Sequence, residues 1–149
     1  MARVKLEIPT NKIFSVNIPV RITDINYGNH LGNDALVSII QEARVQWLAA
    51  SNYSELDVAG ASLIMADLAV EYKGEGFYRD VLQIDISIGE ITRVSFEIFY
   101  EIATTRSEEN ILIAKAKTGM VCFDYNNRKV VAIPENFLNY LKGIEPLRL

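Results

Sequence analysis

Cysteine, histidine and basic clusters are scarce in this 149-residue sequence, and each scarcity excludes a class of protein. The single cysteine, Cys122, excludes an intrachain disulfide and a cysteine-based zinc site, which fits a reducing compartment. Its apolar neighbours indicate a buried filler rather than a nucleophile. A net charge of -4 and a pI near 5.0, with no run of Lys or Arg, argue against a nucleic-acid partner.

Long apolar stretches and cofactor motifs are also missing. No charge-free apolar run reaches the roughly 18 residues of a membrane span, and the N-terminal residues have no apolar segment typical of a secretory signal. One histidine and scattered acids give no metal-ligand spacing, and no glycine-rich nucleotide motif follows a predicted strand. We therefore expect one domain over residues 1–149, cytoplasmic, without a metal or a membrane partner.

The most informative stretch is a polar loop, residues 24–34, followed by the most apolar helix-like segment of the chain. The loop holds two Asp, three Asn, two Gly, one Tyr and the only histidine, His30. Residues 35–50 predict a helix, because apolar residues recur there at three- and four-residue spacing. The recurring positions are Leu36, Ile39, Ile40, Ala43 and Trp47. Further apolar residues outside this stripe indicate a curved sheet around the helix, and Asn33 or Asp34 is the expected N-cap.

The rest of the sequence predicts strands and one short helix. Strands are expected at 13–22, 62–72, 81–91, 94–104, 111–125 and 129–133, and a helix at 134–141. Short polar connections between the middle strands are typical of antiparallel hairpins. The order predicts an α+β fold in which an antiparallel, curved sheet wraps one long central helix.

This order and the loop motif resemble the hotdog-fold acyl-CoA thioesterase family related to 4-hydroxybenzoyl-CoA thioesterase. The matching positions are Val20-Arg21, Asp24, Asn26, Gly28, His30, Asn33 and Glu42-Ala43-Arg44, with Tyr72 and Asp80 further on. The resemblance covers residues 13 to about 133. It implies hydrolysis of a thioester of CoA or of acyl carrier protein, which is the substrate, with no cofactor. It also implies a homo-oligomer, a dimer or a tetramer, whose clefts are shared between subunits.

The loop departs from the family pattern at one position. Many members carry an acid two residues after the Asp that corresponds to Asp24, and here that residue is Asn26. Asparagine cannot accept a proton, so the commonest mechanism of the family does not transfer unchanged. Plant-type acyl carrier protein thioesterases resemble this loop in carrying Asn and His, although their Asn lies closer in sequence to the His than Asn26 lies to His30.

Within this resemblance, His30 is the candidate base, since an imidazole exchanges protons near neutral pH. Asn26 is expected to orient water or substrate. The backbone N–H groups of Gly32, Asn33 or Asp34 are candidate donors to the thioester oxygen, because they lie at the positive end of the helix. Asp24 either orients the imidazole or holds Arg21 or Arg44, and we favour the second, structural role. A loop histidine is otherwise more often a turn residue.

Two further carboxylates, Asp67 and Glu42, are candidate site residues, and each also has a surface alternative. Asp67 either lies on an exposed strand face or, with Glu71, approaches His30 of a neighbouring subunit. Glu42 either faces the edge of the cleft or pairs with Gln46 on the surface. Two other functions also stay open: a non-catalytic acyl-thioester binding protein, favoured by Asn26, and an acyl-CoA hydratase or dehydratase, disfavoured by the spacing of Asp24 and His30.

Overall fold

The computed structural model describes residues 1–143 of the chain. Its elements, in chain order, are β1 (Lys12–Pro19), the 3₁₀-helix η1 (Ile22–Asp24), α1 (Asn33–Ala49), β2 (Ser62–Tyr72), β3 (Val81–Ile91), β4 (Ser95–Arg106), β5 (Glu109–Asp124), β6 (Lys129–Val130) and α2 (Glu135–Leu141). All predicted elements are present. The first strand ends earlier than predicted, because Ile22 already belongs to η1.

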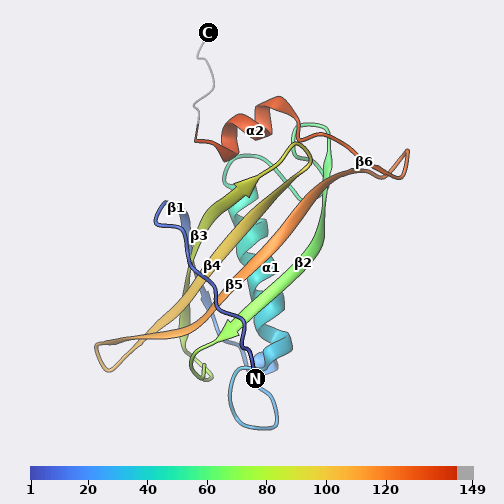
Figure 1. The fold of residues 1–149 in the computed structure, drawn as a ribbon. Helices are drawn as coiled ribbons and strands as arrows, with labels where there is room; N and C mark the ends of the chain where they lie inside the picture. Colours follow the sequence, from blue (N-terminus) through green and yellow to red (C-terminus); the bar gives the residue numbers. More distant parts are fainter. Residues whose placement is uncertain (144–149) are drawn as a thin grey trace.

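The sheet is antiparallel and curves around α1 (Figure 1). Its strand order is β1-β3-β4-β5-β2, and β6 pairs with β5. Alternate residues of β4 point to the helix side and are at most 1% exposed: Phe96, Ile98, Tyr100 and Ile102. They share one core with the apolar stripe of α1. The predicted α+β arrangement, with a long helix inside a curved sheet, is therefore confirmed.

The start of α1 differs from the prediction. Gly32 is the N-cap, with extended φ and ψ of -67° and 145°, and its carbonyl accepts the Leu36 N–H at 3.0 Å. Asn33 and Asp34 already lie inside the first turn, so the prediction that one of them caps the helix is wrong. No side chain caps the first turn. The first-turn N–H groups consequently face the space in front of the helix.

The other end of α1 is covered by α2, which lies at the opposite end of the molecule from the polar loop (Figure 1). Trp47 stacks on Tyr140 with ring centroids 5.9 Å apart, and Phe137 packs edge-on against Tyr53 and Phe96. These aromatic contacts fix the position of α1 on the sheet.

Candidate functional site

The polar loop closes on itself at its base. Ile25 and Leu31 form an isolated β-bridge, and the Asn26 N–H donates to His30 O at 2.9 Å. At the tip, Asn29 has a φ of 63°, a left-handed conformation that asparagine tolerates better than most residues. Asn26 and His30 therefore stand opposite each other where the loop leads into α1.

The His30 ring is half-buried, and one of its nitrogens has a protein partner. Nδ1 lies 3.1 Å from Leu31 O. Because a carbonyl oxygen only accepts, the proton of a neutral ring is on Nδ1, and Nε2 carries a lone pair. Nε2 is 3.1 Å from the point that a β-carbon on Gly28 would occupy. An unprotonated ring nitrogen is the group that a general base uses.

The amide of Asn26 lies beside the same glycine. Its Oδ1 accepts the Gly28 N–H at 2.8 Å and lies 3.3 Å from the same β-carbon position. With the oxygen occupied, the Nδ2 hydrogens have no acceptor among residues 1–143. The Asn26 β-carbon is also close to Gly32, 3.6 Å from where a β-carbon would stand there. The Asn26 side chain therefore lies close to both Gly28 and Gly32.

Only two of the three predicted oxyanion donors are available. The Gly32 N–H donates to Asp24 O at 2.9 Å, so it cannot bind a substrate oxygen. The N–H groups of Asn33 and Asp34 have no acceptor in the described part of the chain. Their position in the first turn gives them the positive end of the helix dipole.

Tyr72 is a residue at this end of the helix to which the sequence had assigned no role. Its hydroxyl donates to Asn33 O at 3.3 Å and brings the end of β2 against the first turn of α1. Partial burial, and to a lesser extent the charge of Asp34, raises the pKa of Tyr72, so the phenol stays a neutral donor at neutral pH. Only its contact with α1 reveals this position, since the two segments are far apart in sequence.

Asp24 contacts Arg21, one of the two partners expected for a structural role. Its side chain is 5% exposed, and its carboxylate accepts from the Arg21 backbone N–H at 2.8 Å and from the Arg21 guanidinium at 3.2 and 3.3 Å. This hydrogen bond, followed by the charge of Asp24, raises the pKa of Arg21. The pair holds the turn before the loop, and no bond between Asp24 and His30 is formed.

Asp67 lies apart from the other predicted residues. It sits at a bulge of β2 on the sheet face that turns away from α1, where its carboxylate accepts from Lys117 Nζ at 3.0 Å and from the Gly119 N–H at 2.9 Å. Glu71, on the same face, pairs with Lys73 and accepts the Leu6 N–H. Within one subunit, neither carboxylate meets His30.

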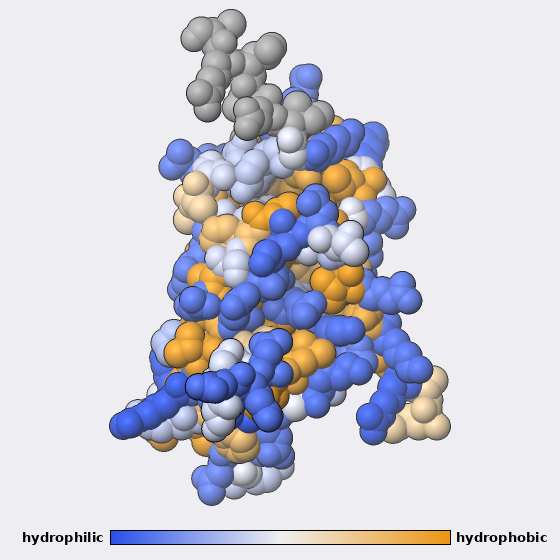
Figure 2. Space-filling view, turned by 90° about the vertical axis from the view of Figure 1, so that its left-hand side faces the viewer, coloured by the Kyte–Doolittle hydropathy of each residue, from blue (hydrophilic) through white to orange (hydrophobic). Residues whose placement is uncertain are grey.

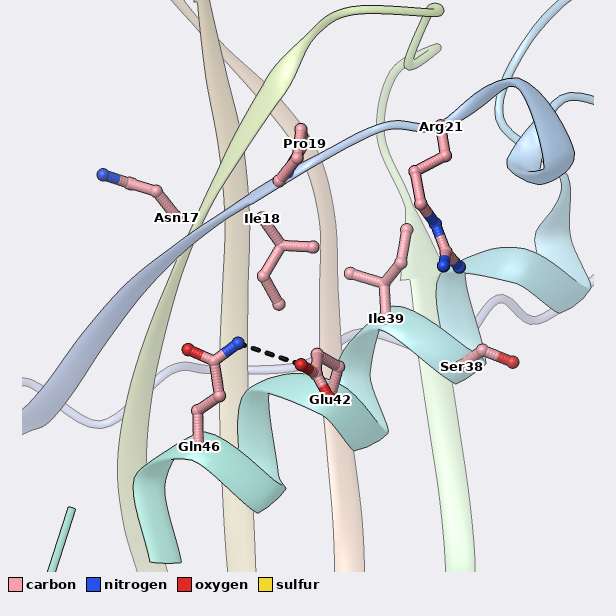
Figure 3. A pocket seen from close by; sticks show the side chains of 8 residues that line it. All are labelled: Asn17, Ile18, Pro19, Arg21, Ser38, Ile39, Glu42 and Gln46. Atoms are coloured by element: carbon pink, nitrogen blue, oxygen red, sulfur yellow. Dashed lines mark hydrogen bonds between the residues drawn. The ribbon is translucent and has the colours of Figure 1, made fainter. Parts of the chain in front are cut away.

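Glu42 forms the predicted pair with Gln46, beside a hollow that is separate from His30. It accepts a hydrogen bond from Gln46 Nε2 at 3.0 Å, and both side chains line a hollow of about 410 Å³ between β1 and α1 (Figure 3). Arg21 reaches toward α1 at one end of this hollow, whereas Asn17 points away from it. The molecular surface on the β1 side alternates between polar and apolar residues (Figure 2). Neither Asn26 nor His30 lines the hollow.

Within residues 1–143, no helix is both long enough and apolar enough to span a membrane. The same residues contain no group of three or more His, Cys, Asp and Glu side chains placed to hold a metal ion.

Comparison with known proteins identifies the family. The model of the thioesterase-like superfamily matches residues 20–141. A protein of Aquifex aeolicus (strain VF5) that bears the name of an esterase is 31% identical over 104 residues, which are 68% of this chain and 77% of that protein. The residues matched by the superfamily model contain the loop, α1 and the whole sheet after β1. The chain therefore belongs to the thioesterase-like superfamily, and the predicted thioester hydrolase class is confirmed.

Solved structures agree on the fold. A 1,4-dihydroxy-2-naphthoyl-CoA thioesterase from Synechocystis superposes with a TM-score of 0.78 at 20% identity, over 89% of this chain and 98% of that one. A DHNA-CoA thioesterase from Staphylococcus aureus gives 0.74 at 18% identity, over 86% and 85%. The predicted hotdog fold is confirmed. The roles of individual site residues stay predictions.

Proposed function

We propose that this protein hydrolyses an acyl thioester of CoA or of acyl carrier protein, with His30 as the base and without a cofactor. The observation that supports this most directly is the position of the lone pair of His30 Nε2. It lies near the same glycine as the Asn26 amide oxygen, in the loop that leads into the uncapped start of α1. Thioester hydrolysis requires an activated water and a polarised carbonyl, which a base and free backbone donors can supply.

In the proposed reaction, the N–H groups of Asn33 and Asp34 hold the thioester carbonyl oxygen. His30 Nε2 takes a proton from water as the water oxygen attacks the carbonyl carbon, and negative charge develops on the carbonyl oxygen next to the helix N-terminus. Collapse of this intermediate breaks the C–S bond, and the imidazolium returns the proton to the departing thiolate. The products are a free acid and a free thiol. The Asn26 amide orients the water or the substrate and takes up no proton.

The direct test is release of free thiol from a panel of acyl-CoA thioesters by the purified protein. Turnover by wild type that falls in Asn26→Ala supports the proposal. Equal rates in wild type and variant would remove Asn26 from the mechanism. Tight binding of the same thioesters without any turnover would instead favour the non-catalytic binding protein. That alternative is considered because Asn26 stands where many members of the family carry an acid.

We also propose that the protein forms a cytoplasmic homodimer or homotetramer through the open edge of β2. This strand ends the sheet order, and no strand in residues 1–143 pairs with its outer side. Met65 and Leu68 on it are 46% and 37% exposed. An unpaired apolar edge is a surface on which a second copy adds strands. Light scattering of wild type and Leu68→Lys tests this, and an unchanged monomeric mass in both would contradict it.

A further inference from the structure

A second, smaller cavity lies on the other side of α1, between that helix and β2. Its volume is about 190 Å³. Val37, Ile40, Met65 and Leu68 form its apolar walls. The cavity therefore suits part of an apolar chain.

The Arg44 end of this cavity is polar. Arg44 lines it, although the residue is only 5% exposed. The Arg44 Nε–H donates to Glu55 Oε1 at 3.3 Å, and Nη1 donates to the Tyr100 hydroxyl at 3.1 Å. A guanidinium has five N–H groups, so three of them have no acceptor within residues 1–143. Trp47 Nε1 is the only buried side-chain nitrogen or oxygen without a partner in residues 1–143, so the unbonded Nη2 of Arg44 is open to solvent. It can donate to a ligand that occupies the cavity.

The cavity is in line with the proposed reaction site. Asn33, Val37, Ile40 and Arg44 follow one another at three- and four-residue spacing, so they share one face of α1. Along that face, Arg44 lies roughly 16 Å beyond Asn33 at about 1.5 Å per residue. Tyr72 joins β2 to the first turn at one end, and Glu55 faces Arg44 at the other. An acyl chain whose carbonyl sits at the first turn can thus run between α1 and β2 toward Arg44.

The charges of Arg44 and Glu55 define the group that fits. Arg44 and Glu55 together carry no net charge, so a carboxylate gains less there than beside a lone arginine. A hydroxyl matches both neighbours, since its oxygen accepts from the free Arg44 N–H groups and its proton goes to Glu55. Thr118, also in the lining, already shares its hydroxyl with Tyr100 at 2.9 Å.

Building on the proposed function, we infer that the protein selects acyl thioesters whose acyl chain carries a hydroxyl at its far end, with Arg44 as the specificity-determining residue. The occupant of the cavity is the distal part of that chain. A plain chain of the same length would leave the Arg44 donors unpaired.

The test compares acyl-CoA thioesters of several chain lengths, each with and without a terminal hydroxyl. At the chain length that reaches Arg44, wild type should prefer the hydroxylated ester by roughly 10- to 100-fold in kcat/KM, as expected for a hydrogen bond to a charged group. Arg44→Met should bring this ratio close to one. Val37→Phe, which fills the cavity, should lower kcat/KM for both long esters. Val45→Phe is the matched control, because it makes the same change on the outward face of α1.

Binding of non-hydrolysable thioether analogues separates this inference from the proposed function. Hydrolysis of both esters at equal rates by wild type would overturn the inference and leave the proposed function standing. Tighter binding of the hydroxylated thioether, lost in Arg44→Met but without turnover of any ester, would support the inference and reject the hydrolase. If Arg44→Met does not fold, Glu55→Ala serves instead, since it removes the carboxylate that accepts the hydroxyl proton. An unchanged ratio in Glu55→Ala would overturn the inference.

Discussion

The two ends of α1 are built in opposite ways. At the C-terminal end, Trp47 stacks on Tyr140, and Phe137 is fully buried among aromatic rings. At the N-terminal end, exposed first-turn residues leave their N–H groups without acceptors in the described chain, and a half-buried histidine stands nearby. One end contributes contacts that stabilise the fold. The other leaves polar groups without protein partners, so they are open to a ligand.

The largest expected effect tests the N-terminal end. His30→Ala should lower kcat for thioester hydrolysis by about 100- to 10,000-fold, the usual contribution of a positioned general base. Its free energy of unfolding should change by about 1 kcal/mol or less, since only the bond to Leu31 O is lost. Steady-state kinetics and urea unfolding measure the two quantities. Unchanged activity of His30→Ala would show that His30 is a turn residue and not the base.

The matching change at the C-terminal end should have the reverse profile. Phe137→Ala should lower the free energy of unfolding by about 3–5 kcal/mol, because it opens a cavity under the aromatic cluster. Where the variant stays folded, its KM should be close to that of wild type. Thermal and urea unfolding measure the loss, and Phe137→Leu, which keeps most of the volume, is the control. A loss of activity larger than the loss of folded protein would contradict the separation of the two ends.

A smaller steric change tests whether the substrate reacts next to Gly28. Gly28→Ala would place a methyl carbon 3.1 Å from His30 Nε2 and 3.3 Å from Asn26 Oδ1, between the two proposed site groups. The expected result is a fall in kcat/KM of about 100-fold, as for a displacement of about 1 Å, with little change in stability. Gly60→Ala is not a suitable control because Gly60 has a φ of 107°. Ala49→Gly, at the exposed end of α1, is a better one. Full activity of Gly28→Ala would show that the substrate does not bind next to this glycine.

The smallest effect concerns a group outside both ends. Burial raises the pKa of the Cys122 thiol to about 11 from 9.0. Between these values the folded state binds more protons than the unfolded state, so the free energy of unfolding should decrease as the pH rises from about 9 to about 11. Denaturation at several pH values, with Cys122→Ala to remove this contribution, measures the slope. A fast reaction of the native thiol with iodoacetamide near neutral pH would show that Cys122 is accessible after all.

The sequence determined the elements and the family. Apolar spacing at Leu36, Ile39 and Trp47 placed α1, and the residues from Asp24 to Asn33 carried the motif of the thioesterases. These signals are local, because helix periodicity and a loop motif each lie within one short stretch. The sequence also indicated the buried role of Cys122 from its apolar neighbours.

Only the tertiary structure decided what the polar groups touch. It assigned the Gly32 N–H to Asp24 O, turned Asp67 toward Lys117 on the far side of the sheet, and brought Tyr72 against Asn33. It also buried Arg44 with donors unused beside a cavity. A short motif specifies residue types, but hydrogen-bond partners depend on sheet register and on how strands far apart in sequence meet the helix.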